Sequence, residues 1–259
     1  MNNMPAMTGW TWLKEGAGLF RKQPAALTTL LFANILVSLL ISAFDLVGAM
    51  LAVVLIPSLS MAFMKACLMI DNGQRVSPAV LLTGFRKPAV LQLCKVGLIY
   101  LAVSLLLTIL ARFAIDTGFW QQFSQPVDPK NPPLVTGWDM FKIFAIFVLN
   151  VSVLIALSFA APLVYWQQMG PGKAAFYSFF AVWRSARVFV VLLMAWFAIL
   201  FGLCIVFTLL LGGSNVARVA IMWLIFLFIL LLQCSLYAAY RRIFGKPVEA
   251  GAARVNLEK

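Results

Sequence analysis

The chain has 259 residues, of which 63% are hydrophobic and only 11% are charged. Soluble domains carry about one quarter charged residues, so this composition excludes an ordinary soluble protein and predicts an integral membrane protein. The net charge of +12 comes from basic residues that stand beside the ends of apolar runs, which favours membrane phospholipid as the partner and argues against nucleic acid.

The first predicted element is an amphipathic helix in the stretch 10–27, which also contains the joint to the first span. Its apolar side chains form one helical stripe, whereas its charged residues lie off that stripe, so the helix could lie along a membrane surface. The helix ends in Phe-Arg-Lys-Gln before Pro24, and proline is well placed to begin a new helix. The stripe consists of Trp12, Leu13, Gly16, Leu19 and Phe20. We expect no removable signal peptide before this helix, because no basic patch precedes a short apolar run.

Six apolar runs follow, each close to the roughly 20 residues that cross a bilayer core. They are predicted at 24–44, 46–70, 88–115, 140–166, 188–211 and 216–240. Short helices like the first one are predicted at 78–87 and 173–185, and a proline-rich loop at 116–138. The chain is thus predicted to be an all-α membrane protein in which six transmembrane helices form three hairpins, each preceded by a short interfacial helix.

Similar joints precede each hairpin and predict an internal repeat. Phe20-Arg21-Lys22-Gln23-Pro24 corresponds to Phe85-Arg86-Lys87-Pro88 and more loosely to Trp183-Arg184. The units would cover about 8–71, 77–168 and 172–241 of a single membrane domain, with 242–259 as a short tail, and all three would face the same way. The alternative is that any membrane hairpin needs an amphipathic entry and a basic flank.

The distribution of basic residues predicts the orientation. Sixteen Lys and Arg residues lie on or near one side of the predicted spans, and four lie toward the other side: Arg112, Lys130, Lys142 and Arg218. Because positive residues remain in the cytoplasm, both termini and the short helices are expected inside, and the proline-rich loop outside.

The aromatic-Arg joints place guanidinium groups at headgroup depth. Arginine binds a phosphate through two parallel hydrogen bonds, so these joints are candidates for a lipid-headgroup site. The alternative is interfacial anchoring and topology alone, because each basic residue near an anionic leaflet contributes about 1 kcal/mol without a specific lipid. The candidates are Arg21, Lys22, Arg86, Lys87 and Arg184.

Two polar stripes run along predicted spans. One consists of Asn34, Ser38, Ser42 and Asp45, and the other of Tyr100, Ser104, Thr108 and Arg112. Facing stripes would satisfy each other's polar groups and let Asp45 meet Arg112. The stripes are therefore candidates either for structural contacts between helices or for a polar pathway. Prolines at 57 and 162 are expected to kink their spans.

Neither catalytic nor metal chemistry is predicted. The chain has no histidine, and we find no carboxylate pair on one face of a span and no phosphate-binding glycine loop. The cysteines, which lie in or beside apolar runs, are expected to be buried small hydrophobic residues: Cys67, Cys94, Cys204 and Cys234. The protein is thus predicted not to be an enzyme and to need no cofactor.

Several segments together resemble a family of uncharacterised bacterial polytopic inner-membrane proteins. They are residues 8–13, 19–24 and 161–162, the Phe85-Arg86 joint, Gly170-Pro171 and Trp183-Arg184, together with Pro57. The layout is more distantly similar to the membrane domain attached to some glycerophosphodiester phosphodiesterases, although no catalytic domain of that kind is present in this sequence. The resemblance implies the architecture and no reaction.

Two functions remain open from the sequence. The first is an accessory or scaffolding subunit that contacts anionic lipid of the inner leaflet and has other integral membrane subunits as partners. The second is a small transporter or lipid-handling protein with a polar cavity between the hairpins. An enclosed cavity lined by Asn34, Ser38, Ser104 and Thr108 would favour the second, and pairing of these groups would favour the first.

Overall fold

The computed structural model describes residues 4–87, 89–115, 137–212 and 214–247, and every regular element in these residues is a helix. Six helices are long and apolar enough to cross a membrane, so the prediction of a six-span, all-helical membrane protein is confirmed. They are α2 (Pro24–Ser42), α3 (Asp45–Asp71), α4 (Ala89–Ala114), α6 with α7 (Gly137–Gln167), α9 (Ala186–Leu211) and α10 (Asn215–Phe244). Most of the predicted proline-rich loop, and Pro88, lie outside the described residues.

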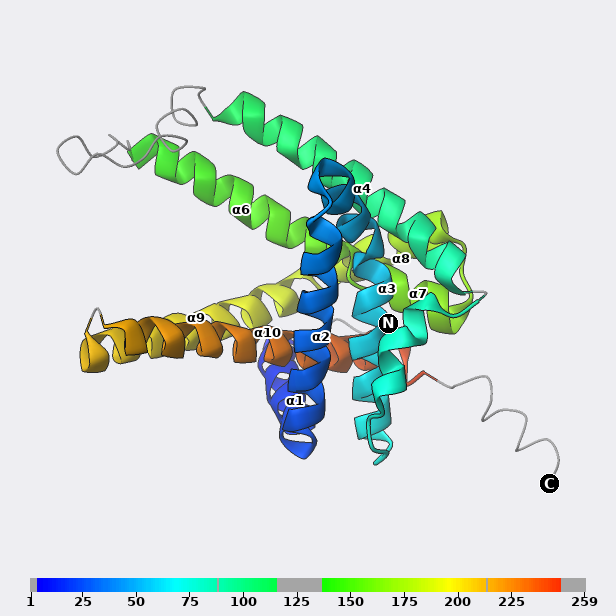
Figure 1. Ribbon diagram of the computed structural model, residues 1–259, viewed down its shortest axis with the longest axis horizontal. Coiled ribbons are helices and arrows are strands. Elements are labelled where there is room, and N and C mark those ends of the chain that lie inside the picture. Colours follow the sequence, from blue (N-terminus) through cyan, green and yellow to red (C-terminus); the bar gives the residue numbers. More distant parts are fainter. Residues whose placement is uncertain (1–3, 88, 116–136, 213, 248–259) are drawn as a thin grey trace.

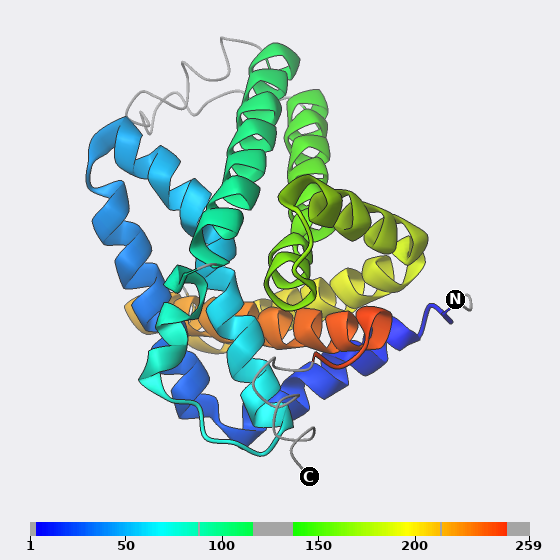
Figure 2. The ribbon, with the colours of Figure 1, turned by 90° about the vertical axis from the view of Figure 1, so that its right-hand side faces the viewer.

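The long helices diverge from one shared end. Helix α3 contacts both α2 and α4, α4 also contacts α6, and α9 contacts α10. We refer to α2 with α3, α4 with α6, and α9 with α10 as the three pairs, which spread apart toward their far ends (Figures 1 and 2). We call the shared end the base and define it by the buried side chains Trp12, Phe159 and Tyr237. Helix α1 (Thr8–Lys22) lies at the base beside α10.

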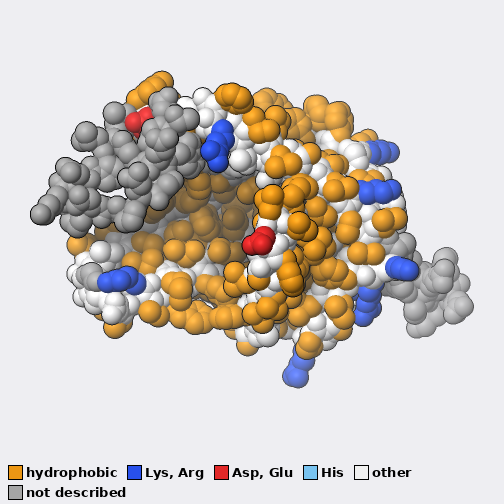
Figure 3. Space-filling model, turned by 45° about the horizontal axis from the view of Figure 1, so that its top comes forward, with side chains coloured by type: hydrophobic (Ala, Val, Ile, Leu, Met, Phe, Trp, Pro, Cys, Tyr) orange, Lys and Arg blue, Asp and Glu red, His pale blue; other side chains and the backbone are white. Residues whose placement is uncertain are grey.

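Most buried residues of each long helix lie toward one end. They lie mainly in the first half of α2, α4 and α9, and mainly toward the far end of α3 and α10, apart from Gly48 and Ala217. When two consecutive helices run in opposite directions and meet at one end, the first part of one lies beside the last part of the other. The buried residues therefore alternate between the first and the last part of successive helices. The opposite ends expose large apolar side chains such as Phe113 and Leu209, and the surface between the pairs is hollowed and lined by hydrophobic side chains (Figure 3).

The apolar stripe of α1 packs against protein. Trp12 is 1% exposed and its ring centroid lies 5.3 Å from that of Phe189 on α9. Gly9 and Gly16 face the backbones of α9 and α10 so closely that an added Cβ would lie 2.8 Å from Leu192 N and 2.7 Å from Ser235 N. The stripe therefore forms part of the core. Its contacts with α9 and α10 account for its apolar residues without a membrane surface.

The three short segments that precede the long helices differ from one another. The segment η1 (Pro78–Phe85) is a 3₁₀ helix, so the prediction of a second helix like α1 was wrong in type. Its Gly84 lies against the backbone of Ser58 on α3. Helix α8 (Pro171–Arg184) buries Ala174, Ser178 and Val182 and exposes five aromatic side chains: Phe176, Tyr177, Phe179, Phe180 and Trp183. The internal repeat stays a prediction.

The fourth span is broken before Pro162. Helix α6 (Gly137–Leu157) ends there and α7 (Ala160–Gln167) begins after two residues, because a proline ring clashes with the carbonyl four residues earlier. The buried Ser178 of α8 satisfies the groups that this break frees: its hydroxyl donates to Ala156 O and accepts from Phe159 N. At Pro57, by contrast, α3 continues without a break.

A cluster of charged side chains ties three helices together at the base. Arg241 of α10 donates to Asp71 Oδ1 at the end of α3 (2.7 Å) and to Glu15 Oε2 of α1 (2.8 Å). Asp71 Oδ2 also accepts from Lys246 Nζ and from Tyr237 OH, each at 3.2 Å. Arg241 is one of the sixteen basic residues that predict the orientation, and its partners in this cluster lie far away along the chain.

Two buried thiols from distant helices touch each other. Cys67 of α3 and Cys234 of α10 have their Sγ atoms 3.7 Å apart, and both are buried free cysteines. We expect a membrane-permeant thiol oxidant to join them, because their Sγ atoms are already in contact and a disulfide needs them at about 2.05 Å. Mass spectrometry of peptides should find the Cys67–Cys234 linkage. Cys234→Ser should abolish this linkage, and a dominant linkage to Cys94 or Cys204 would contradict the packing of α3 on α10.

Candidate lipid-headgroup site

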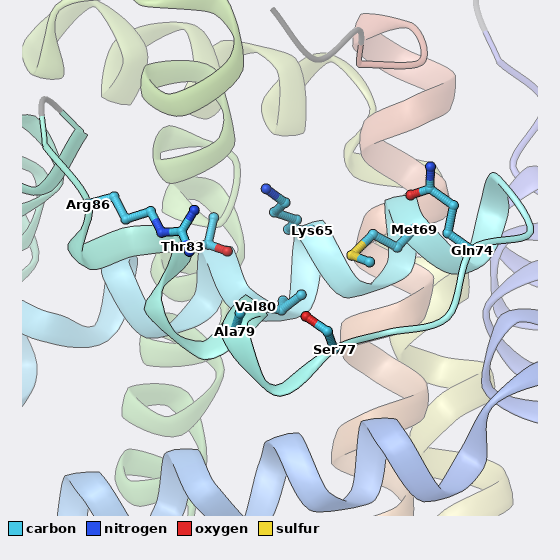
Figure 4. Close-up of a pocket in the computed structure, with 8 residues that line it drawn as sticks. All are labelled: Lys65, Met69, Gln74, Ser77, Ala79, Val80, Thr83 and Arg86. Atoms are coloured by element: carbon cyan, nitrogen blue, oxygen red, sulfur yellow. The ribbon is translucent and has the colours of Figure 1, made fainter. Parts of the chain in front are cut away.

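A pocket of about 230 Å³ lies between α3 and η1. Its lining combines two cationic side chains with hydroxyl and amide groups (Figure 4). We call it the headgroup pocket. It is lined by Lys65, Met69, Gln74, Ser77, Ala79, Val80, Thr83 and Arg86.

Two close contacts hold the walls of the headgroup pocket. Gly84 allows the end of η1 to approach the Ser58 backbone, because an added Cβ would lie 2.7 Å from the Ser58 Cα. Arg86 follows η1 directly in extended conformation. On the opposite side, Gln23 Nε2 donates to Gln74 O (2.7 Å), and Val76 N donates to Gln23 Oε1 (3.0 Å). Gln23, the residue just before α2, therefore holds the loop that borders the pocket in place.

The arrangement of the lining side chains suits a phosphate-bearing headgroup. Arg86 and Thr83 lie at one end of the pocket, Gln74 and Ser77 lie at the other, and Lys65 lies between them (Figure 4). A guanidinium can bind two phosphate oxygens at once, and an ammonium adds a compact positive charge. The lining therefore offers hydrogen bonds and positive charge. In the described ranges no group of three Cys, Asp or Glu side chains could hold a metal ion.

The structure places one of the five predicted headgroup residues in this pocket. Arg21, Lys22 and Lys87 are exposed and do not line it, and Arg184 is exposed at the end of α8. Lys65, to which sequence analysis gave no role, lines the pocket instead. In the sequence, the only sign that Lys65 lines the pocket with Met69 is their spacing, because residues four apart share one face of a helix.

The polar stripes use their hydrogen bonds mainly along their own helices. Ser42 donates to Ser38 O and Thr108 donates to Ser104 O, whereas Tyr100 OH donates to Leu157 O of α6. Asn34, Ser38 and Ser42 border a separate groove between α2, α3 and α10, which Ser104 and Thr108 do not line. Asp45 and Arg112 are both exposed, and their pairing stays a prediction.

Comparison with known proteins gives one informative relative. A probable inner membrane protein of Burkholderia thailandensis is 33% identical in an alignment that covers 96% of this chain and 95% of the relative. No protein-family model and no solved structure matches the chain. The relative and the six membrane-length helices place the protein in the bacterial inner membrane, which it crosses several times. The chain belongs to the same family of inner-membrane proteins as this relative.

Proposed function

We propose that this protein is a lipid-handling protein of the inner membrane that binds the phosphate headgroup of an anionic phospholipid in the headgroup pocket. One observation carries the proposal: Arg86 and Lys65, from two different elements, line the same polar pocket. Surface arginines that served topology alone would not need a cavity with hydroxyl and amide groups around them. The proposal assigns no reaction to the protein.

The proposed orientation places the base in the cytoplasm with both termini inside. Three observations support it: α1 ends in Arg21 and Lys22, α8 ends in Arg184, and α10 carries Arg241 and Arg242 in its last turn. All these helix ends are basic, and basic flanks remain on the cytoplasmic side. The headgroup pocket would then meet the inner leaflet, where anionic lipids concentrate.

A role as an accessory or scaffolding subunit is the second candidate, because the outer halves of the helix pairs expose large apolar side chains. Phe113 is 87% exposed and Leu209 is 79% exposed, and partner helices could cover such surfaces. Purification in mild detergent tests this candidate: a stoichiometric membrane partner would support it, and a clean monomer would contradict it. The lipid-handling function is supported instead by the headgroup pocket, in which Arg86 and Lys65 share one polar lining.

The headgroup proposal predicts different effects for two neighbouring cations. We expect Arg86→Ala to reduce retention of phosphatidylglycerol about tenfold, since hydrogen bonds to charged groups contribute about 1.5–3 kcal/mol. Arg86 and Lys87 are both exposed, but only Arg86 lines the pocket. Lys87→Ala removes the same charge and should change retention much less. Native mass spectrometry of the purified full chain, with phosphatidylglycerol and phosphatidylcholine added in turn, measures the retained lipid.

Two controls define the bound group. Inorganic phosphate added at the same concentration should not displace phosphatidylglycerol; displacement would identify a free-phosphate site instead. Equal losses in Arg86→Ala and Lys87→Ala would show that the arginine acts only as surface charge, and would overturn the proposal.

A further inference from the structure

A second cavity lies within the spanning part of the molecule. It has a volume of about 300 Å³ and is bordered by Asn34, Ser38 and Ser42 of α2, Ser60 of α3 and Gln233 of α10. We call it the mid-span groove. Asn34 comes ten residues after Pro24, the first residue of α2. At about 1.5 Å per residue it lies about 15 Å along the helix, near the middle of a bilayer core about 30 Å thick.

The mid-span groove offers hydrogen-bond acceptors. Asn34 is 7% exposed, and its Nδ2 donates to Leu59 O (3.3 Å), whereas its Oδ1 has no partner among the described residues. Ser42 donates its proton to Ser38 O (2.8 Å), and Ser60 donates to Pro57 O (3.0 Å). Their oxygens therefore remain able to accept. A buried acceptor without a partner costs about 1–3 kcal/mol, so a donor in the groove would be bound favourably.

The lining also limits the ligand. It contains no charged side chain, so it cannot balance a cation or an anion at this depth. About 10–15 Å³ of such volume holds one water molecule, so the groove is far larger than a water site. Its remaining walls are apolar, with Ile35, Leu39, Ile56, Leu59 and Phe63. A matching ligand is neutral, mostly hydrocarbon, and carries a hydrogen-bond donor.

We propose that the mid-span groove binds a neutral membrane lipid with a free hydroxyl group, of the diacylglycerol type. The amide of Asn34, whose Oδ1 is buried without a partner among the described residues, turns toward the groove on binding; the hydroxyl then donates to Oδ1, and the acyl chains lie against the apolar walls. This site is separate from the headgroup pocket and depends on different residues, so either site could exist without the other.

A diacylglycerol with a photoactivatable diazirine on one acyl chain tests the proposal with the full chain in mild detergent. We expect Asn34→Leu to reduce labelling of groove peptides about fivefold, which corresponds to about one hydrogen bond. The matched control is Asn150→Leu on α6, where Asn150 Nδ2 donates to Ile146 O of its own helix (2.9 Å). This variant should label like the parent protein.

Competition identifies the hydroxyl as the recognised group. Unlabelled diacylglycerol should displace the probe, and triacylglycerol with the same chains, which has no free hydroxyl, should not. Equal competition by both, or unchanged labelling of Asn34→Leu, would overturn the proposal. Arg86→Ala should leave the labelling unchanged, so failure of this site and failure of the headgroup pocket can be distinguished.

A second pair of variants keeps the test decisive if Asn34→Leu does not fold. Ser60→Ala removes an acceptor of the groove, and Ser158→Ala removes a serine that donates to a carbonyl three residues earlier in the same way, to Ile155 O (2.8 Å), outside the groove. Labelling should fall about twofold for Ser60→Ala only. Equal labelling of both variants would count against the proposed site.

Discussion

We expect Gly16→Ala to unfold more readily than Gly18→Ala, with a difference in free energy of unfolding of about 1 to 3 kcal/mol. The Cβ added at Gly16 would lie 2.7 Å from Ser235 N and 2.9 Å from Ser235 Cα, and these are backbone atoms that cannot move aside alone. At Gly18 an added Cβ meets nothing within 4 Å. Both changes raise helix propensity by about 1 kcal/mol, so this gain cancels in the comparison.

Thermal unfolding of the purified variants in detergent measures this difference. Gly9→Ala should behave like Gly16→Ala, because its Cβ would approach the backbone of Leu192 on α9 at 2.8 Å. Equal melting temperatures for Gly16→Ala and Gly18→Ala would mean that α1 does not pack on α10, and that its apolar stripe faces lipid. A clear difference would show that α1 is part of the folded core.

Loss of the Arg241 side chain should destabilise the base by about 1 to 2 kcal/mol. Arg241→Met keeps an unbranched apolar stem but removes the guanidinium and its charged hydrogen bonds to Asp71 and Glu15. The Asp71 side chain is 12% exposed, whereas those of Arg241 and Glu15 are 32% and 36% exposed. Partial exposure weakens such ion pairs through solvent screening, so we expect less than the cost of breaking a fully buried pair.

The neighbouring Arg242 provides the matched control for this prediction. Arg242 is exposed and follows Arg241 in the last turn of α10, so Arg242→Met removes the same charge without touching the cluster. The stability difference between the two variants should shrink as salt is raised from 0.1 to about 1 M, because the Debye length falls from about 10 to 3 Å. Equal unfolding of Arg241→Met and Arg242→Met at low salt would exclude the cluster as a link between α1, α3 and α10.

Local composition was sufficient to predict the protein class and the six spans. The length of an apolar run is compared directly with the thickness of a bilayer, and this comparison needs no knowledge of neighbouring helices. Predicted and observed bounds accordingly agree closely, for example 188–211 against Ala186–Leu211 for α9. The break near Pro162 was also foreseeable, since a proline disturbs its own helix. Arg86 was likewise predicted from the local sequence, because it follows an aromatic residue in a basic joint.

Only the tertiary structure decided which apolar faces meet protein and which meet lipid. Leucine facing a neighbouring helix and leucine facing an acyl chain are equivalent by hydropathy, so the sequence could not show that Trp12 would be buried or that Phe113 would be exposed. It could not join Lys65 to Arg86, or Arg241 to Asp71 and Glu15, because these pairs depend on how separate helices pack. Hydropathy is local along the chain, whereas a site between helices is formed by packing.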